Sequence, residues 1–264
     1  MTLSAAWLRS DGNVRELVMA TDSRLRGPFV WDACPKILSL ARNDCALAFA
    51  GSTSVAYPFM LQVHAAVKQY APSLNRAVDL VDFKGHVLNV INGMRSAMHS
   101  FPTPPQKNEE EETYLVLGGY SWRFAQFKIW TLHYDKLISE FTFRPATAWD
   151  GIDGDRLLAV VGDHVPEAKK RLLNLLDSKG KKQAGGFDME PFEVLRDMIR
   201  LATYTEIGGP PQLVKVYRHM NCTPFAVHWP NSKSGQVTVL GRALLSYEKS
   251  EVGILNPDTL EIGL

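Results

Sequence analysis

The chain has 264 residues, of which 45% are hydrophobic and 22% charged, and this composition is typical of a folded globular protein rather than a disordered one. Its formal net charge of +1, without a cluster of Lys and Arg, gives no reason to expect a nucleic-acid partner. Three cysteines without CxxC spacing favour a reducing compartment, and no window approaches the roughly 18 apolar residues of a membrane helix, so we expect a cytoplasmic protein with no membrane partner.

The first fifty residues have the pattern of β-strands. Residues 2–9 and 14–21 flank the sequence SDGN, a turn signal of the Asp-Gly kind, and this arrangement predicts a β-hairpin. Two shorter apolar runs, 37–40 and 45–49, are separated by a polar turn. They predict a second pair of strands.

Helical spacing begins after this β region. Apolar residues from Val55 to Val67 predict a helix that begins near Thr53, and a similar pattern predicts a second helix over about 74–98. The Pro-rich and acidic run that follows, 99–112, indicates a solvated loop.

The rest of the chain alternates between short strands and two further helices. Strands are predicted over 113–120, 124–134, 138–144, 157–162, 211–219, 224–229 and 236–241. Helices are predicted over about 166–176 and 189–204, with a loop between them. Helices grouped between runs of strands favour an α+β class with two stacked sheets and a helix pair on each outer side. We expect one domain, 1–264, with loop insertions at about 99–112 and 178–188 and a tail at about 242–264.

Several short stretches together indicate a family. They are Thr2 at the start of the first strand, ATDSR at 20–24, the lysine of CPKIL, AFAGST at 48–53, LGGY at 117–120 and EIGGPPQ at 206–212. In this order and at this spacing, they make the chain resemble the proteasome-type N-terminal-nucleophile (Ntn) hydrolases. It is similar to β subunits of the 20S proteasome and to the bacterial ATP-dependent two-ring peptidase.

This resemblance implies a fold and a function. The implied fold is the four-layer αββα sandwich of Ntn hydrolases. The implied function is a threonine peptidase that needs no cofactor, acts on peptides or proteins and begins at Thr2 once Met1 has been removed. The resemblance also implies a homo-oligomeric ring or arc and an ATPase as a further partner.

The implied chemistry centres on Thr2. A threonine hydroxyl is a poor nucleophile, but an N-terminal threonine carries its own base, the free α-amine, whose reference pKa is about 7.7–8.0. By resemblance, the catalytic residues include Lys36, placed beside the Thr2 oxygen, and Asp22, which keeps this lysine charged and oriented. Without the Thr2 context, Asp22 and Lys36 would be interpreted as an ordinary structural ion pair.

Two further site residues are matched to the family. Gly51 corresponds to the catalytic glycine whose backbone N–H faces the carbonyl oxygen under attack, although a simple turn glycine is an equal alternative. Phe49 would line the substrate pocket, with a core phenylalanine as the alternative.

The chain departs from the family at two places. Gly162-Asp163-His164 stands where active β subunits have Gly-Ser-Gly, and 204–208 replaces an Asp-Ser-x-Ser-Gly run. Thr203, Thr205 and Asp163 are candidates to replace the missing groups. These departures leave two alternatives open: a non-catalytic ring or scaffold subunit, and an amidohydrolase that acts on a small amide.

No metal site is expected. His219, Cys222 and His228 lack the usual pairs of ligands. The acidic stretch 150–155 resembles a fragment of a calcium loop but lacks its later Glu, so we interpret it as a turn.

Overall fold

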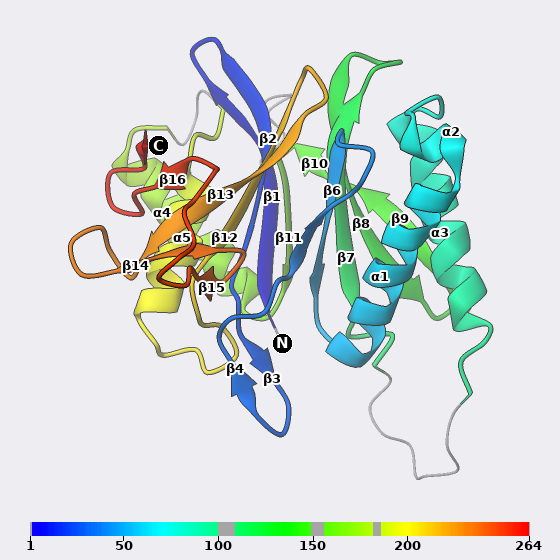
Figure 1. Cartoon of the computed structure of the whole chain (residues 1–264), viewed down its shortest axis with the longest axis horizontal. Helices are drawn as coiled ribbons and strands as arrows, with labels where there is room; N and C mark the ends of the chain where they lie inside the picture. The colour runs from blue at the N-terminus through cyan, green and yellow to red at the C-terminus, as the bar shows by residue number, and fades with distance from the viewer. Residues whose placement is uncertain (1, 100–108, 149–155, 182–185, 264) are drawn as a thin grey trace.

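The computed structural model describes residues 2–99, 109–148, 156–181 and 186–263. Two mainly antiparallel sheets pack against each other, and helices lie against the outer face of each (Figure 1). Met1, the acidic stretch 150–155 and most of the predicted insertion at 99–112 lie outside the described residues.

The larger sheet has ten strands and contains both ends of the described chain. Its order is β10-β11-β1-β2-β12-β13-β14-β15, with β16 beside β13 and β17 beside β16. The strands are β1 Leu3–Asp11, β2 Val14–Thr21, β10 Thr147–Ala148, β11 Leu157–Gly162, β12 Gln212–Tyr217, β13 Cys222–Trp229, β14 Gln236–Val239, β15 Arg242–Ala243, β16 Ile254–Leu255 and β17 Ile262–Gly263. The predicted hairpin of β1 and β2 is confirmed, with Asp11 opposite Val14 at the turn.

The smaller sheet has five strands in the order β5-β6-β7-β8-β9, so that neighbours along the chain are neighbours in space. The strands are β5 Ile37–Ser39, β6 Cys45–Ala50, β7 Tyr114–Ser121, β8 Gln126–Asp135 and β9 Glu140–Pro145. The predicted strand pair is confirmed as β5 and β6, and the strands predicted over 113–120, 124–134 and 138–144 are confirmed as β7, β8 and β9.

A short ribbon missed by the sequence analysis projects beside the N-terminal end of β1 (Figure 1). It consists of β3 Leu25–Arg26 and β4 Val30–Trp31, and its tip exposes Phe29 and Trp31. Two-residue strands carry too little periodicity to be predicted from sequence.

The helices divide into two groups, one on each sheet. The helices are α1 Thr53–Gln69, α2 Ala71–Leu74, α3 Leu80–Arg95, α4 Val165–Ser178 and α5 Glu190–Arg200. Apolar residues of α1 and α3 share one core with the five-stranded sheet, including Phe59 and Phe83. Those of α4 and α5, such as Leu172 and Phe192, share a second core with the ten-stranded sheet.

A third core joins the two sheets. It contains small and branched residues that face each other across the interface, among them Ala6 and Met19 of the larger sheet and Ala48 and Val116 of the smaller one. Because this core fixes β1 against β6, loops at the ends of both sheets can contribute side chains to one site.

The predicted fold class requires correction. The sequence analysis named an α+β, four-layer αββα sandwich of the Ntn hydrolase type, but the described residues are mostly antiparallel sheet, 36% strand against 26% helix. The sheets are unequal because segments interpreted as loop or tail, such as 242–264, add the short strands β15 to β17. The predicted helix 74–98 is also shorter, because α3 begins only at Leu80. The molecule is better described as an antiparallel two-sheet structure with helices on its outer faces.

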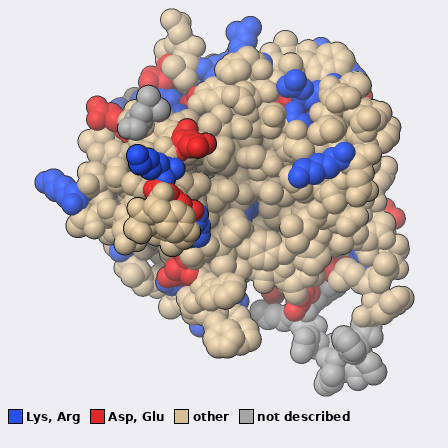
Figure 2. Space-filling model, viewed as in Figure 1, with Lys and Arg blue, Asp and Glu red and all other residues tan. Residues whose placement is uncertain are grey.

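The face of the molecule shown in Figure 2 has no single dominant charge. On the face shown in Figure 2, Lys and Arg lie scattered among uncharged residues, and Asp and Glu lie beside several of them. Among the described residues, no helix is long and apolar enough to cross a membrane.

Candidate active site

Thr2 lies at the centre of the larger sheet, directly before β1. Strand β1 is held between β11 and β2, with Leu3 opposite Gly162 and Ser4 opposite Thr21. Thr2 is fully buried. The first residue of a central strand is thus fixed from both sides.

Lys36 reaches Thr2 from the loop that precedes β5, a strand of the smaller sheet. Its Nζ donates a hydrogen bond of 2.6 Å to Thr2 Oγ1 and another of 2.9 Å to Asp22 Oδ1. Lys36 and Asp22 are both fully buried, so water does not screen their ion pair. The structure therefore brings together three of the predicted site residues, Thr2, Asp22 and Lys36.

Asp22 follows β2 and is held by four donors. Besides Lys36 Nζ, its carboxylate accepts the backbone N–H of Leu3 at 3.2 Å, of Arg24 at 3.0 Å and of Gly208 at 3.1 Å. Burial raises the pKa of the Asp22 carboxyl, while Lys36 and the N–H groups of Gly208 and Leu3 work against the rise. The carboxylate also orients the chain at Leu3, next to the hydroxyl that Lys36 contacts.

The charge on Lys36 depends on its neighbours. Burial lowers the pKa of its amine, and the carboxylates of Asp22 and Asp163 oppose this shift. A buried lysine with a carboxylate at 2.9 Å is well suited to favour negative charge developing on the oxygen that it touches.

Gln212, the first residue of β12, holds the Lys36 loop in place. Its Oε1 accepts the backbone N–H of Lys36 at 2.9 Å, while its Nε2 donates to Ser23 Oγ at 2.9 Å and to the Cys34 carbonyl at 2.7 Å. The sequence analysis quoted this glutamine only as the end of EIGGPPQ and gave it no role. The signal available was a polar residue at the start of a buried strand, where an amide must find partners.

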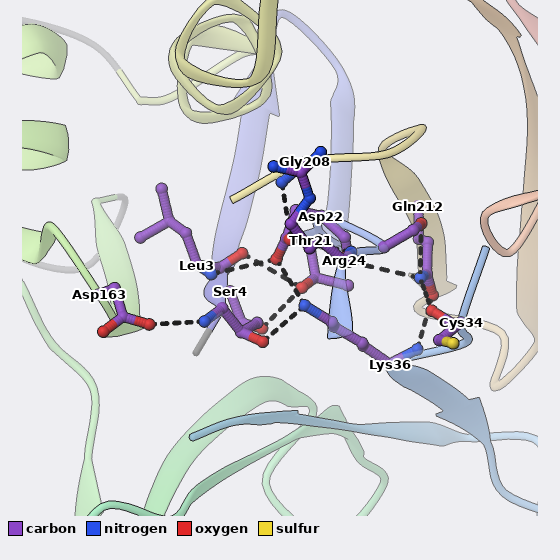
Figure 3. Close-up of polar contacts among 12 residues, drawn as sticks. Leu3, Ser4, Thr21, Asp22, Arg24, Cys34, Lys36, Asp163, Gly208 and Gln212 are labelled. Carbon is purple, nitrogen blue, oxygen red and sulfur yellow. Dashed lines mark hydrogen bonds and ion pairs between the residues drawn. The ribbon is translucent and has the colours of Figure 1, made fainter. Parts of the chain in front are cut away.

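Asp163 also bonds to Thr2, and its side chain lies well apart from that of Lys36 (Figure 3). Its Oδ2 accepts a hydrogen bond from the backbone N of Thr2 at 2.6 Å, and its own N–H donates to the Thr2 carbonyl at 2.7 Å. The preceding Gly162 has φ +107°, and a Cβ there would lie 1.9 Å from the Thr2 carbonyl oxygen. Only glycine lets the chain turn so closely around Thr2.

The other candidate substitutes bond elsewhere. Thr203 Oγ1 donates to the Leu201 carbonyl at 3.2 Å, and Thr205 Oγ1 accepts from Arg26 at 2.9 Å. Of the three candidates, Asp163 is the one whose side chain bonds to Thr2.

Gly51 and Phe49 have clear structural roles. Gly51 has φ +103°, and a Cβ there would lie 1.7 Å from the Glu112 carbonyl oxygen, so the turn into α1 requires glycine. The Phe49 ring is fully buried and packs against Tyr57 with centroids 5.1 Å apart. The Phe49 N–H also donates to the Lys36 carbonyl at 3.2 Å. The catalytic role of Gly51 and the pocket role of Phe49 stay predictions.

The described residues hold no group of three or more His, Cys, Asp or Glu arranged to bind a metal ion. The site's chemistry is therefore considered from its own groups: a hydroxyl, the nitrogen of the same residue, one buried cation and two carboxylates. Together these can supply a nucleophile, a base and stabilisation of an oxyanion.

No family profile matches the sequence, and a search of curated proteins finds no match. Solved structures do match. Anbu from Hyphomicrobium sp. strain MC1 has a TM-score of 0.57 and 17% identity, and the match covers 84% of this chain and 85% of that one. The helical assembly of the Anbu complex from Pseudomonas aeruginosa has a TM-score of 0.59 and 16% identity, with 90% and 87% covered.

These likenesses correct the resemblance drawn from the sequence. The structural neighbours are Anbu proteins, a proteasome-like but distinct family, so membership of the Ntn hydrolases beside proteasome β subunits is not upheld. Short motifs such as ATDSR and LGGY are too small to separate one proteasome-like family from another. At 16–17% identity the likeness shows a shared fold alone.

Proposed function

We propose that this protein is a threonine-type hydrolase of peptide bonds that uses Thr2 as its nucleophile. The observation that carries the proposal is the 2.6 Å hydrogen bond from the buried Lys36 Nζ to Thr2 Oγ1, with Asp22 on the same ammonium group. This hydrogen bond places the ammonium charge of Lys36 directly beside the hydroxyl that would act as the nucleophile.

The proposed reaction begins once Met1 has been removed and Thr2 carries a free α-amine. The amine takes the proton from Oγ, which bonds to the substrate carbonyl carbon, and Lys36 stabilises the negative charge as it develops on oxygen. The protonated amine of Thr2 then gives its proton to the leaving nitrogen as the C–N bond breaks. Water hydrolyses the resulting ester, giving one proton to the amine, which passes it back to Oγ.

Asp22 serves this reaction through Lys36. Its carboxylate opposes the loss of the lysine's proton that burial favours. It also accepts the N–H of Leu3, so one group fixes both the cation and the start of β1.

We also propose that the chain assembles into homo-oligomers. The Anbu complex of Pseudomonas aeruginosa forms a helical assembly, and this chain exposes large apolar side chains, including Phe29 and Trp31, that an interface would cover. An ATPase partner stays a prediction.

Two substitutions test the nucleophile. Thr2→Ala keeps the amine and removes the hydroxyl, so hydrolysis of fluorogenic peptides should disappear, whereas Thr2→Ser keeps both groups and should retain activity. Intact mass should show in each protein that Met1 has been lost, and circular dichroism should show an unchanged fold. Full activity in a folded Thr2→Ala protein would refute the proposal. A wild-type protein that retains Met1 and is inactive would support the scaffold alternative.

A further inference from the structure

Asp163 places a second carboxylate in the site, on the side of Thr2 that Lys36 does not occupy. Its Oδ2 lies 2.6 Å from the Thr2 nitrogen, the atom that serves as the base in the proposed function. The sequence analysis noted that active β subunits have a serine here and named Asp163 as one candidate to replace it. A carboxylate differs from a hydroxyl because it carries a full negative charge.

The contact is built into the fold. Strand β11 pairs with β1 so that Gly162 lies opposite Leu3, and the next residue along β11 is then level with Thr2. The Asp163 N–H donates to the Thr2 carbonyl at 2.7 Å while its side chain accepts from the Thr2 nitrogen. Thr2 is therefore held by both its backbone groups, and the carboxylate has little freedom to turn away.

We propose that Asp163 is the positioning residue of the base: it holds the Thr2 amine in place and stabilises the ammonium formed when that amine takes the proton from Oγ. This inference rests on the proposed function. The proton still moves only between Oγ, the amine and the leaving nitrogen. Asp163 takes no part in this transfer and acts through the charge of its carboxylate.

The charged groups around the Thr2 amine set the direction in which we expect its pKa to shift. Lys36, from the loop before β5, disfavours a protonated amine, and Asp163 favours one. Asp22 contacts Lys36 Nζ and the N–H of Leu3, and its charge is shared with that ammonium. His164, next to Asp163, is turned to Glu206, with Nε2 3.1 Å from Oε2. Asp163 supplies a carboxylate in direct contact with the Thr2 nitrogen.

A pH dependence follows with a definite sign. By stabilising the ammonium, Asp163 raises the pH at which the amine becomes free to act as base, so the acid limb of kcat/KM lies higher than it would without this charge. Asp163→Asn keeps the shape and removes the charge. An opposite charge in contact commonly moves a pKa by about 1–3 units, so the acid limb should move to lower pH by about that amount. The plateau rate should fall, since the ammonium loses its partner.

The matched control is Glu167→Gln. Glu167 lies in the first turn of α4, four residues beyond Asp163, and pairs with Arg171 at 2.7 Å. This variant changes the net charge by the same amount without touching Thr2, so its pH profile should stay where the wild type has it. Asp163→Ser supplies a second variant in case the asparagine protein fails to fold.

A second readout does not depend on activity. The pKa of the Thr2 amine is measured by competitive labelling with acetic anhydride across a pH series, with the N-terminal peptide quantified by mass spectrometry. We expect a lower amine pKa in Asp163→Asn than in wild type and Glu167→Gln.

The outcomes separate the two proposals. An unchanged amine pKa and an unchanged acid limb in Asp163→Asn would overturn the role of Asp163, even if Thr2→Ala is inactive. Wild-type hydrolysis that persists in Thr2→Ala would instead overturn the proposed function, and with it any role of Asp163 in the reaction. A shift of both quantities in Asp163→Asn alone supports the inference.

Discussion

Lys36 faces two opposing effects that decide what it can do. Removing an ammonium group from water costs several kcal/mol, and this cost lowers the pKa of Lys36. The carboxylate of Asp22 at 2.9 Å and the hydroxyl of Thr2 at 2.6 Å offset the cost. An ion pair of this kind contributes little net stability, so its place beside a hydroxyl is better explained by chemistry than by folding.

Replacing Lys36 tests this interpretation against a matched pair elsewhere. Lys36→Met should lower kcat/KM by about 100-fold or more, because it removes the positive charge beside the Thr2 oxygen on which negative charge develops. Lys215→Met removes another buried lysine, whose Nζ lies 2.8 Å from Glu16. Lys36→Met should cost about 3–5 kcal/mol of stability, because it leaves the Asp22 carboxylate buried without a cation. Lys215→Met should cost less, because Glu16 keeps its 2.8 Å ion pair with Arg9.

Peptidase assays and urea unfolding on the two proteins separate the effects. At a temperature where both are folded, Lys215→Met should keep its activity. Equal losses of activity in the two proteins would mean that Lys36 acts only through stability.

The sequence analysis predicted site residues better where they lie close together along the chain than where the pairing of distant strands brings them together. Asp22 follows the first hairpin by one residue, so its place beside the start of β1 could be predicted from the turn. Asp163 meets Thr2 only because β11 pairs with β1, and Gln212 meets Lys36 only because β12 pairs with β2. No local periodicity contains those pairings, so the sequence analysis offered Asp163 as one of three candidates and gave Gln212 no role.

At the scale of elements, helix α3 shows where hydrophobic periodicity and capping differ. Periodicity predicted a helix from about residue 74, whereas α3 begins at Leu80. Asp79 is its N-cap, and its carboxylate accepts the N–H of Val81 at 3.0 Å and of Arg123 at 3.1 Å. A capping carboxylate that also ties the β7–β8 turn decides the boundary more strongly than the apolar pattern does.

The cap predicts a pH-dependent stability. Although burial acts to raise it, the hydrogen bonds from Val81, Arg123 and Ser121 lower the pKa of Asp79 below its usual 3.8. Because the folded-state pKa is the lower one, this stabilisation is complete above pH 3.8 and is lost as the pH falls through the folded-state value.

Asp79→Ala should therefore lower the free energy of unfolding at pH 7 by about 2 kcal/mol. The gap to wild type should narrow when the pH falls below 3.8. Urea unfolding at both pH values measures this gap. The control Asp82→Ala, in the same first turn but exposed, should change stability much less. A difference in the free energy of unfolding that stays constant down to acid pH would contradict the claim that the charged Asp79 carboxylate stabilises α3.

At the scale of the whole molecule, the site exists because two sheets meet. Thr2, Asp22 and Asp163 come from the larger sheet, and Lys36 comes from the loop that leads into the smaller one. The core between the sheets, which includes Ala6 and Ala48, holds Lys36 at a fixed distance from Thr2. The sequence analysis expected a four-layer αββα sandwich, whereas the structure has two unequal sheets, whose sizes depend on short strands that only tertiary pairing creates.

We expect the purified protein to be a homo-oligomer in solution. Multi-angle light scattering at micromolar concentration should give a mass that is a multiple of 29.5 kDa. Assembly would cover exposed apolar residues such as Phe29 and Trp31. A mass of one chain across the concentration range would contradict homo-oligomerisation while leaving the chemistry of Thr2 untested by that result.

The most direct measurement of the central claim is the position of a covalent adduct. The purified protein is incubated with a peptide β-lactone, which acylates a reactive hydroxyl, and the modified residue is mapped by mass spectrometry. We predict a single acyl group on Thr2 Oγ of a chain that has lost Met1, and no adduct on Thr2→Ala. An unmodified protein, or an adduct on another residue, would contradict the claim that Thr2 is the nucleophile.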